Sequence, residues 1–272
     1  MDLQIKGKLA LVTGSTQGIG KAIATRLLQE GANVIVNSRS QKNIDKMLEE
    51  QSFASAVTDE MTGKLIGVAA DISAAKGAEH LINKIKEIGD VDILINNVGY
   101  FEYKPFFEVT DEDWTDLFDL NVMSGVRLTR ALMPKMLAKN WGRIVFIASE
   151  AGVKPNPNML HYSVTKTAQI ALARGLAEMT KGTAVTVNSA LVAPTWTEGV
   201  EVFLDKIAST SGTTVDAMKT DYFKADGASS LLQRFADVNE IADLVVFLCS
   251  TNASAINGSA QRVDGGIIRS IL

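Results

Sequence analysis

Cysteine and histidine are almost missing from this chain of 272 residues, which contains one cysteine, Cys249, and two histidines, His80 and His161. One thiol cannot form an internal disulfide, and one thiol with two imidazoles is too small a donor set for a dedicated zinc site. We therefore expect chemistry without a metal, and we expect a cytoplasmic protein.

Long apolar runs and a basic surface are also lacking. No stretch approaches the roughly 18 apolar residues of a membrane span, and residues 1–8 contain no apolar segment typical of a signal peptide. The net charge is −4 and the lysines and arginines are scattered, whereas binding to nucleic acid requires a basic surface. We expect neither a membrane nor a nucleic acid among the partners.

The composition that remains is that of a globular protein with a sizeable core. Hydrophobic residues make up 46% of the chain and charged residues 21%, which excludes a disordered polyelectrolyte. No internal repeat and no linker rich in proline, glycine or serine divides the chain. We expect a single nucleotide-binding domain that covers residues 1–272.

Short runs rich in valine and isoleucine alternate with segments of helical pattern. Buried strands are predicted at residues 9–12, 33–36, 65–69, 92–95, 143–148 and 184–191, and helices at 20–30, 74–88, 111–139 and 162–179. This alternation predicts an α/β fold of the Rossmann type, a doubly wound parallel sheet of about seven strands with helices on both faces.

The segment 196–232 interrupts the alternation. Its apolar residues, among them Trp196, Phe203 and Tyr222, are interleaved with serine, threonine and glycine, which predicts helices joined by a mobile loop. Because it lies between the last two strands at the carboxyl side of the sheet, we expect a lid over the substrate. The alternative is a helical excursion that packs on the body.

A glycine-rich turn follows the first predicted strand and leads directly into a helix. Its residues are Thr13, Gly14, Ser15, Thr16, Gln17, Gly18, Ile19 and Gly20. Glycine lets the backbone approach a pyrophosphate, and the helix N-terminus offers free N–H groups and a positive dipole end. The strand before it and the helix after it favour a dinucleotide site, and a tight turn that needs small residues is the alternative.

The ends of the second and third strands indicate which dinucleotide binds. An acidic residue after the second strand would bond the ribose hydroxyls of NAD, but this chain has Ser38 and Arg39. A guanidinium suits a 2′-phosphate, so we expect NADP (as NADPH) rather than NAD, with a solvated loop arginine as the alternative. Asp71, followed by Ile72, would contact the adenine, or would cap a helix that begins near Ser73.

Tyr162 and Lys166 stand one turn apart on a predicted helix. A phenol ionises near pH ~10, and an adjacent ammonium lowers that pKa, so the pair can transfer protons. The alternative is an interfacial tyrosine beside a solvated lysine. Ser149 ends the fifth predicted strand, and the loop that follows, with Gly152 in it, can bring the two hydroxyls together.

Together with Asn96-Asn97-Val98-Gly99 and Asn121, these motifs resemble the short-chain dehydrogenase/reductase family from about Lys8 to Gly266. The resemblance implies a catalytic tetrad of Asn121, Ser149, Tyr162 and Lys166. Tyr162 would exchange a proton with the substrate oxygen during hydride transfer, and Ser149 would polarise that oxygen. Lys166 would lower the pKa of the phenol and bond the nicotinamide ribose, and Asn121 would anchor a water that links Lys166 to solvent.

The resemblance also implies further contacts with the cofactor. Asn97 and Gly99 would line the adenine ribose side of the cleft, and Pro194 and Thr197 would belong to the loop beside the nicotinamide. Thr195 replaces a glycine usual in the family, and a β-branched residue does not readily adopt positive φ, so the course of this loop stays open.

These observations lead to an NADP-dependent oxidoreductase that transfers a hydride between a nicotinamide cofactor and a carbonyl or secondary alcohol. A 3-oxoacyl-(acyl-carrier-protein) reductase is a more specific hypothesis, in which Arg127, Arg130 and Lys135 would meet the carrier. The fold is also compatible with a cofactor-binding sensor or scaffold without turnover, and with an epimerase. The resemblance implies a homotetramer or dimer, and Glu150 is expected to line the substrate pocket.

Overall fold

The computed structural model describes residues 1–58 and 63–271 and confirms the doubly wound sheet. Seven parallel strands of these residues are arranged in the order β3-β2-β1-β4-β5-β6-β7. They are β1 (Leu9–Val12), β2 (Asn33–Ser38), β3 (Leu65–Ala69), β4 (Ile93–Asn96), β5 (Gly142–Ser149), β6 (Val185–Val192) and β7 (Ala260–Val263). The strand order reverses between β1 and β4, and in such sheets ligands bind beyond the carboxyl ends of the strands at this point.

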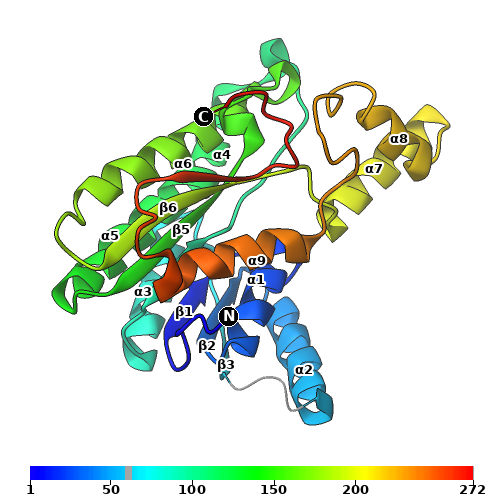
Figure 1. Cartoon of the computed structure of the whole chain (residues 1–272). Helices are drawn as coiled ribbons and strands as arrows, with labels where there is room; N and C mark the ends of the chain where they lie inside the picture. The colour runs from blue at the N-terminus through cyan, green and yellow to red at the C-terminus, as the bar shows by residue number, and fades with distance from the viewer. Residues whose placement is uncertain (59–62, 272) are drawn as a thin grey trace.

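Helices cover both faces of the sheet (Figure 1). They are α1 (Gly18–Gln29), α2 (Gln41–Thr58), α3 (Ala75–Ile88), α4 (Asp111–Phe118), α5 (Ser124–Ala138), α6 (Leu160–Glu178), α7 (Glu198–Ser211), α8 (Val215–Tyr222) and α9 (Val238–Cys249). The core cluster on one face combines α1 and α9 with the sheet, and that on the other face combines α3, α5 and α6. The five central strands are therefore buried on both sides, as their continuous apolar runs predict, whereas the edge strands β3 and β7 are mostly half-buried.

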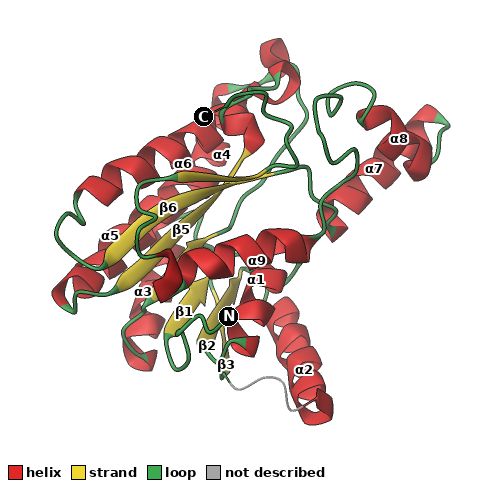
Figure 2. Cartoon of the chain, in the orientation of Figure 1, coloured by secondary structure: helices red, strands yellow, loops and turns green. Residues whose placement is uncertain are grey.

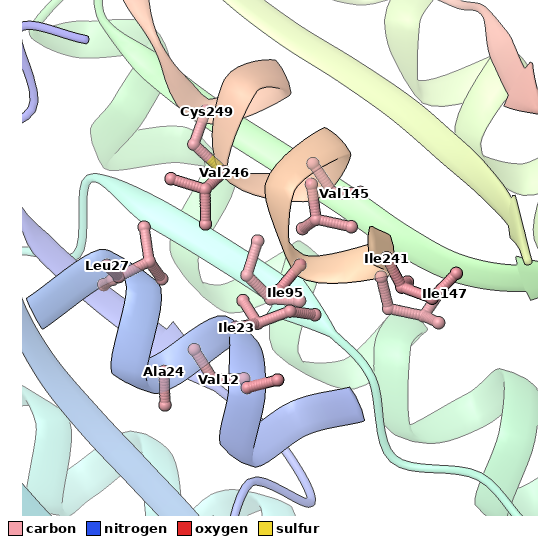
Figure 3. Packing of buried hydrophobic residues seen from close by; sticks show 14 of the residues in the cluster. Val12, Ile23, Ala24, Leu27, Ile95, Val145, Ile147, Ile241, Val246 and Cys249 are labelled. Atoms are coloured by element: carbon pink, nitrogen blue, oxygen red, sulfur yellow. The ribbon is translucent and has the colours of Figure 1, made fainter. Parts of the chain in front are cut away.

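Close packing of α1 and α9 fixes the glycine-rich turn on the sheet. Ile23 and Leu27 of α1 and Ile241 of α9 are fully buried against Val12 and Val145 of the strands (Figure 3). Each such side chain stabilises the fold by about 1.5–3 kcal/mol. The start of α1, and with it the turn, is held rigidly at the end of β1.

The single cysteine belongs to this same core. Cys249, at the end of α9, is fully buried, and burial raises the pKa of its thiol to about 12 (Figure 3). A thiol that stays protonated is a poor nucleophile and a poor metal ligand. Among the described residues, no group of three or more histidine, cysteine, aspartate or glutamate side chains is arranged to hold a metal ion.

The predicted helix at 111–139 is wrong in one respect, because it is not continuous. α4 ends at Phe118, a single π-helical turn spans Asp119–Met123, and α5 begins at Ser124. Such turns widen the backbone spiral and often occur at functional sites. Asn121 is buried within this turn.

The interrupting segment is helical, as expected. α7 and α8 stand at one end of the molecule, between β6 and β7 in sequence, and extend away from the sheet (Figure 2). The chain returns to the body where Leu231 and Leu232 donate backbone hydrogen bonds to the carbonyl of Gly265. In the described part of the chain, no helix has the length and apolarity to cross a membrane.

Candidate active site

The glycine-rich turn needs glycine for two different reasons. Gly14 and Gly18 have φ of 59° and 54°, in the left-handed region that favours glycine. A Cβ on Gly20 would lie 2.4 Å from Asn97 Nδ2 and 2.4 Å from the Gly14 oxygen. Gly20 therefore leaves room for the side chain that supports the turn from β4.

Hydrogen bonds between Thr13 and the segment that begins at Asn97 hold the turn in place. Asn97 Nδ2 donates to the backbone oxygens of Thr13 (2.8 Å) and Gly14 (3.0 Å). Thr13 Oγ1 accepts from the backbone nitrogens of Asn97 and Val98, each at 3.0 Å. The Asn97 side chain thus stabilises the turn. The sequence pattern does not predict this contact.

Ser15 also supports the turn with its side chain. Its buried hydroxyl donates to the oxygen of Val12 at 2.7 Å and accepts from the nitrogen of Asn37 at 3.0 Å. The hydroxyl therefore links β1 to β2. If Ser15 contacts a cofactor, as the sequence predicts, it would do so through its backbone in the turn.

The N-terminus of α1 already holds an anion from the protein itself. Gln17, the N-cap residue, forms no side-chain cap, and the backbone nitrogen of Gly18 donates to Glu198 Oε2 at 3.0 Å. Thr197 lies alongside, since its Cγ2 would be 3.3 Å from a Cβ on Gly18. The geometry shows that this end of α1 accommodates an oxyanion, which is the requirement for a pyrophosphate.

A cation stands at the end of β2, where the sequence predicts a contact with the adenosine part of a cofactor. Arg39 is exposed at the end of β2 and forms no hydrogen bond or ion pair with any residue that the structure describes. Ser38 Oγ accepts from the nitrogen of Ser40 at 3.2 Å. Asp71 Oδ1 accepts from the nitrogen and hydroxyl of Ser73 at 3.1 and 2.7 Å, and Ile72 is buried.

Asp71 is not the cap of the following helix. α3 begins at Ala75, and its N-cap, Ala74, has no side-chain cap bond. The capping hypothesis for Asp71 is therefore wrong, and the carboxylate orders the turn before the helix.

Asn121 uses its whole side chain to hold the backbone around the site. Its Oδ1 accepts from the nitrogen of Tyr100 at 2.9 Å, and its Nδ2 donates to the Tyr100 oxygen and to Thr165 Oγ1, each at 3.0 Å. Its backbone oxygen accepts from Gln169 Nε2 at 2.6 Å. The π-helical turn is thereby joined to the loop after β4 and to α6.

Lys166 is buried, and its ammonium lies in the same region as the Asn121 side chain, beside Gly99. Nζ donates to the oxygen of Ile147 at 2.8 Å and to Gln169 Oε1 at 3.0 Å, and it lies 5.5 Å from the ring centroid of Tyr162. Burial lowers the pKa of this ammonium to about 8, and the charge of Glu150 opposes that shift. A Cβ on Gly99 would lie 3.5 Å from Nζ, so Gly99 is beside the tetrad.

Tyr162 differs from the sequence expectation in its acidity. Removal of the phenol from water, and then the charge of Glu150, raises its pKa above the usual value, while a hydrogen bond with Ser149 lowers it. The sequence expectation was a lowered pKa, whereas burial and Glu150 outweigh the bond from Ser149 and leave the pKa of the phenol above its usual value. The phenol is held protonated, as a proton donor must be.

Glu150 is the residue responsible for part of this effect. The Ser149 hydroxyl donates to Glu150 Oε2 and accepts from the nitrogen of Ala151 at 3.1 Å. Burial raises the pKa of the Glu150 carboxyl, although the bond from Ser149 lowers it. A carboxyl directly after the serine therefore acts on the acidity of the Tyr162 phenol.

The loop after β6 shows why threonine can stand at position 195. Thr195 pairs with Ala236 in an isolated parallel bridge, and its hydroxyl donates to the oxygen of Ala193 at 2.8 Å. Trp196 N donates to the Ala236 oxygen, and Ala236 N donates to the Pro194 oxygen, each at 2.9 Å. Thr195 is not among the non-glycine residues with positive φ, so a β-branched side chain fits without strain.

The sequence matches a known protein family over most of its length. The model of the family described as short chain dehydrogenase matches residues 8–208. The chain belongs to the short-chain dehydrogenase family. The match includes the glycine-rich turn, the π-helical turn, β5 and α6, so every element that carries the tetrad lies within it.

Relatives and solved structures place this short-chain dehydrogenase among oxidoreductases. It is 57% identical to the uncharacterized oxidoreductase YvrD of Bacillus subtilis, over the full length of both chains. It is 32% identical to the 3-oxoacyl-[acyl-carrier-protein] reductase FabG of Haemophilus influenzae, covering 97% of this chain and 99% of the relative. The L-sorbose reductase of Gluconobacter frateurii, solved with NADPH and L-sorbose, superimposes over both whole chains with a TM-score of 0.91 at 30% identity.

These similarities establish the reaction class. The chain is a short-chain oxidoreductase with a seven-stranded Rossmann-type sheet, and solved structures that it resembles contain NADPH. A sensor or scaffold without turnover finds no support in them.

Proposed function

We propose that this enzyme uses NADPH to reduce a ketone to a secondary alcohol, or runs the reverse reaction, with Tyr162 as the proton donor. The observation that carries the proposal is the meeting of three groups at the carboxyl end of β5. The Ser149 hydroxyl lies close enough to the Tyr162 phenol to lower its pKa, and the Lys166 ammonium lies 5.5 Å from the phenol ring. A hydroxyl that orients, a phenol that donates and a buried cation that stabilises are the parts that carbonyl reduction needs.

The chain's own residues divide this work. Ser149 and Tyr162 hold the substrate oxygen between two hydroxyls, and Tyr162 transfers its proton to that oxygen. Lys166 stabilises the phenolate that remains, because an ammonium nearby favours the charged form. Asn121 and its π-helical turn keep Lys166 and α6 in position, and the nicotinamide supplies the hydride.

The proposed cofactor site uses the N-terminus of α1 for the pyrophosphate. The oxyanion of Glu198 at Gly18 and the close fit of Gly20 against Asn97 support this assignment. Arg39 would bind the 2′-phosphate, since it is exposed at the end of β2 and has no partner among the residues that the structure describes. We therefore propose a preference for NADPH over NADH.

The segment 196–232 is proposed as the substrate lid. Phe203 of α7 contacts Phe101 edge-on at 5.8 Å, and Phe101 in turn contacts the Tyr162 ring at 6.2 Å. An aromatic chain thus joins the segment to the reacting group. We also propose a homotetramer or dimer formed through α4 to α6, supported by the exposed apolar side chains of Phe118 and Val164.

A 3-oxoacyl-(acyl-carrier-protein) reductase is the second candidate, favoured by relatives of that activity at 32% identity. The basic residues assigned to the carrier are partly engaged within the chain. Arg127 pairs with Asp119 at 2.7 Å, and Lys135 pairs with Asp90. Of the three, Arg130 alone has no ion pair in the described part of the chain, and we favour a small carbonyl substrate for this reason.

The test is a panel of carbonyl compounds with each cofactor. The panel contains the ketose L-sorbose, simple diketones and an acetoacetyl thioester. Consumption of NADPH or NADH is followed by absorbance. We expect turnover of at least one ketone, faster with NADPH, and a large loss of activity in Ser149→Ala. If Ser149→Ala consumes NADPH as fast as the wild type does, Ser149 at the end of β5 does not have the proposed role.

A further inference from the structure

Gln169 connects two members of the tetrad directly. It lies on α6 three residues after Lys166, and its side chain is 1% exposed. Its Oε1 accepts from Lys166 Nζ at 3.0 Å, and its Nε2 donates to the backbone oxygen of Asn121 at 2.6 Å. One buried amide therefore spans from the π-helical turn to the lysine.

The chemistry of the two partners fixes the orientation of this amide. An ammonium only donates hydrogen bonds, and a backbone carbonyl only accepts them. The amide oxygen must face Lys166 and the amide nitrogen must face Asn121. Glutamate offers no donor for the carbonyl when ionised, and methionine offers neither partner a strong bond, so glutamine matches both demands.

Lys166 depends on its acceptors because it is buried. Two of its three ammonium protons are bound by the Ile147 oxygen and by Gln169 Oε1. The titratable groups facing it among the described residues are Tyr162 on its own helix and Glu150 from the turn after β5. Hydrogen bonds to a charged form stabilise that form, so Gln169 favours the ammonium over the neutral amine.

We propose that Gln169 is a positioning residue that holds Lys166 in its charged form and in register with Asn121. The family resemblance implies that Asn121 anchors a water that links Lys166 to solvent, whereas here the Gln169 side chain joins Lys166 to the Asn121 backbone oxygen. An amide fixes distance and direction more tightly than an exchangeable water. The inference rests on the proposed role of Lys166 in proton transfer.

The experiment measures Lys166 without any substrate. Protein labelled with ¹³C at the lysine Cε is titrated by NMR, and the Lys166 signal is identified by its absence in Lys166→Arg. In Gln169→Met we expect the pKa of Lys166 to fall by roughly one unit, because a hydrogen bond to a charged group is lost. In Gln169→Glu we expect a rise, because a carboxylate takes the acceptor's place.

A matched control is available in Gln51→Met. Gln51 is also buried and also bonds through its amide, to Thr25 Oγ1 at 3.1 Å, but it lies on α2. We expect the Lys166 titration in this variant to match the wild type. An unchanged Lys166 pKa in folded Gln169→Met would overturn the proposal. If Gln169→Met does not fold, Gln169→Glu decides the matter, with a raised pKa in support and an unchanged pKa against.

A kinetic arm separates this inference from the proposed function. With any ketone that the enzyme reduces, the alkaline limb of the kcat/KM profile should move to lower pH in Gln169→Met, whereas a merely structural role would lower activity equally at every pH. If the alkaline limb does not move and Tyr162→Phe is inactive, the role of Gln169 is contradicted and the proposed function is not. Activity retained in Tyr162→Phe contradicts the proposed function instead.

Discussion

The glycine-rich turn and the proposed lid face the same site but are built in opposite ways. The turn is held by buried residues: Thr13 and Ser15 are fully buried, and Asn97 bonds two of its carbonyls. In the lid, α8 has no buried residue, and Ala208 is the buried residue of α7 among those that the structure describes. Segments with few buried contacts open at low free energy.

The difference teaches where each kind of specificity resides. In the proposed function, the turn and tetrad, which are fixed to the sheet, determine the cofactor and the chemistry. The proposed lid touches the turn through Glu198 on Gly18, and it reaches Tyr162 only by way of Phe101, so we expect it to adapt to a substrate. Changes in the turn should therefore act on cofactor binding, and changes in the lid should act on KM.

Among the changes that compare the turn with the lid, the largest effect is expected in the turn itself, from Gly20→Ala. The new methyl group would lie 2.4 Å from Asn97 Nδ2 and from the Gly14 oxygen. Overpacking of this kind costs about 1–3 kcal/mol, which we expect as a roughly 10- to 100-fold weaker NADPH affinity in a fluorescence titration.

The matched control for this substitution is Gly175→Ala on α6, where no atom lies within 4 Å of the added Cβ. It should leave NADPH affinity unchanged and stabilise the helix by about 0.5–1 kcal/mol. Equal affinities in the two variants would show that the turn tolerates a side chain at position 20.

A somewhat smaller effect is expected from Arg39→Ala at the edge of the cofactor site. Loss of a bond between two charged groups should weaken NADPH binding by roughly 10-fold or more, while NADH binding changes little. Isothermal titration with both cofactors measures the ratio. A parallel loss for NADPH and NADH would mean that the guanidinium does not meet the 2′-phosphate.

In the lid, Phe203→Ala should raise KM by roughly 2- to 10-fold, the worth of one aromatic pair. We expect the melting temperature and NADPH affinity to stay close to the wild type, because Phe203 is only partly buried. Steady-state kinetics with an accepted ketone gives the answer. A lower melting temperature with unaltered KM would assign α7 to the rigid body.

The smallest effect concerns the acid stability of the body. A bond from Lys104, and then bonds from Thr110, lower the pKa of Asp113 to about 2, and a bond from Arg234 lowers that of Glu240 to about 2. Lowered carboxylate pKa values add stability above the unfolded values, and this stability is lost as pH falls through about 2. Asp113→Asn should flatten the fall in melting temperature below pH ~4. An unchanged slope would show that the Asp113 carboxylate does not contribute to the acid dependence of stability.

The positions of the glycine-rich turn and of Tyr162 and Lys166 on one helix were predictable because their signals are local. Glycines between a strand and a helix, and Tyr162 four residues before Lys166, carry their meaning in short stretches of sequence. The π-helical turn was not predictable, since Asn121 fits a continuous helical pattern equally well. The acidity of Tyr162 and the bridge from Gln169 to Asn121, 48 residues apart, exist only once the fold brings those groups together.

The most direct test of the central claim is the kcat of Tyr162→Phe with NADPH and an accepted ketone. Phenylalanine keeps the ring and its contact with Phe101 and removes only the proton donor. We predict a kcat lower by about 10²–10⁴-fold, with the fold and the NADPH affinity retained. A kcat within a few-fold of the wild type would contradict the account, since Tyr162 would then not be the group that protonates the substrate.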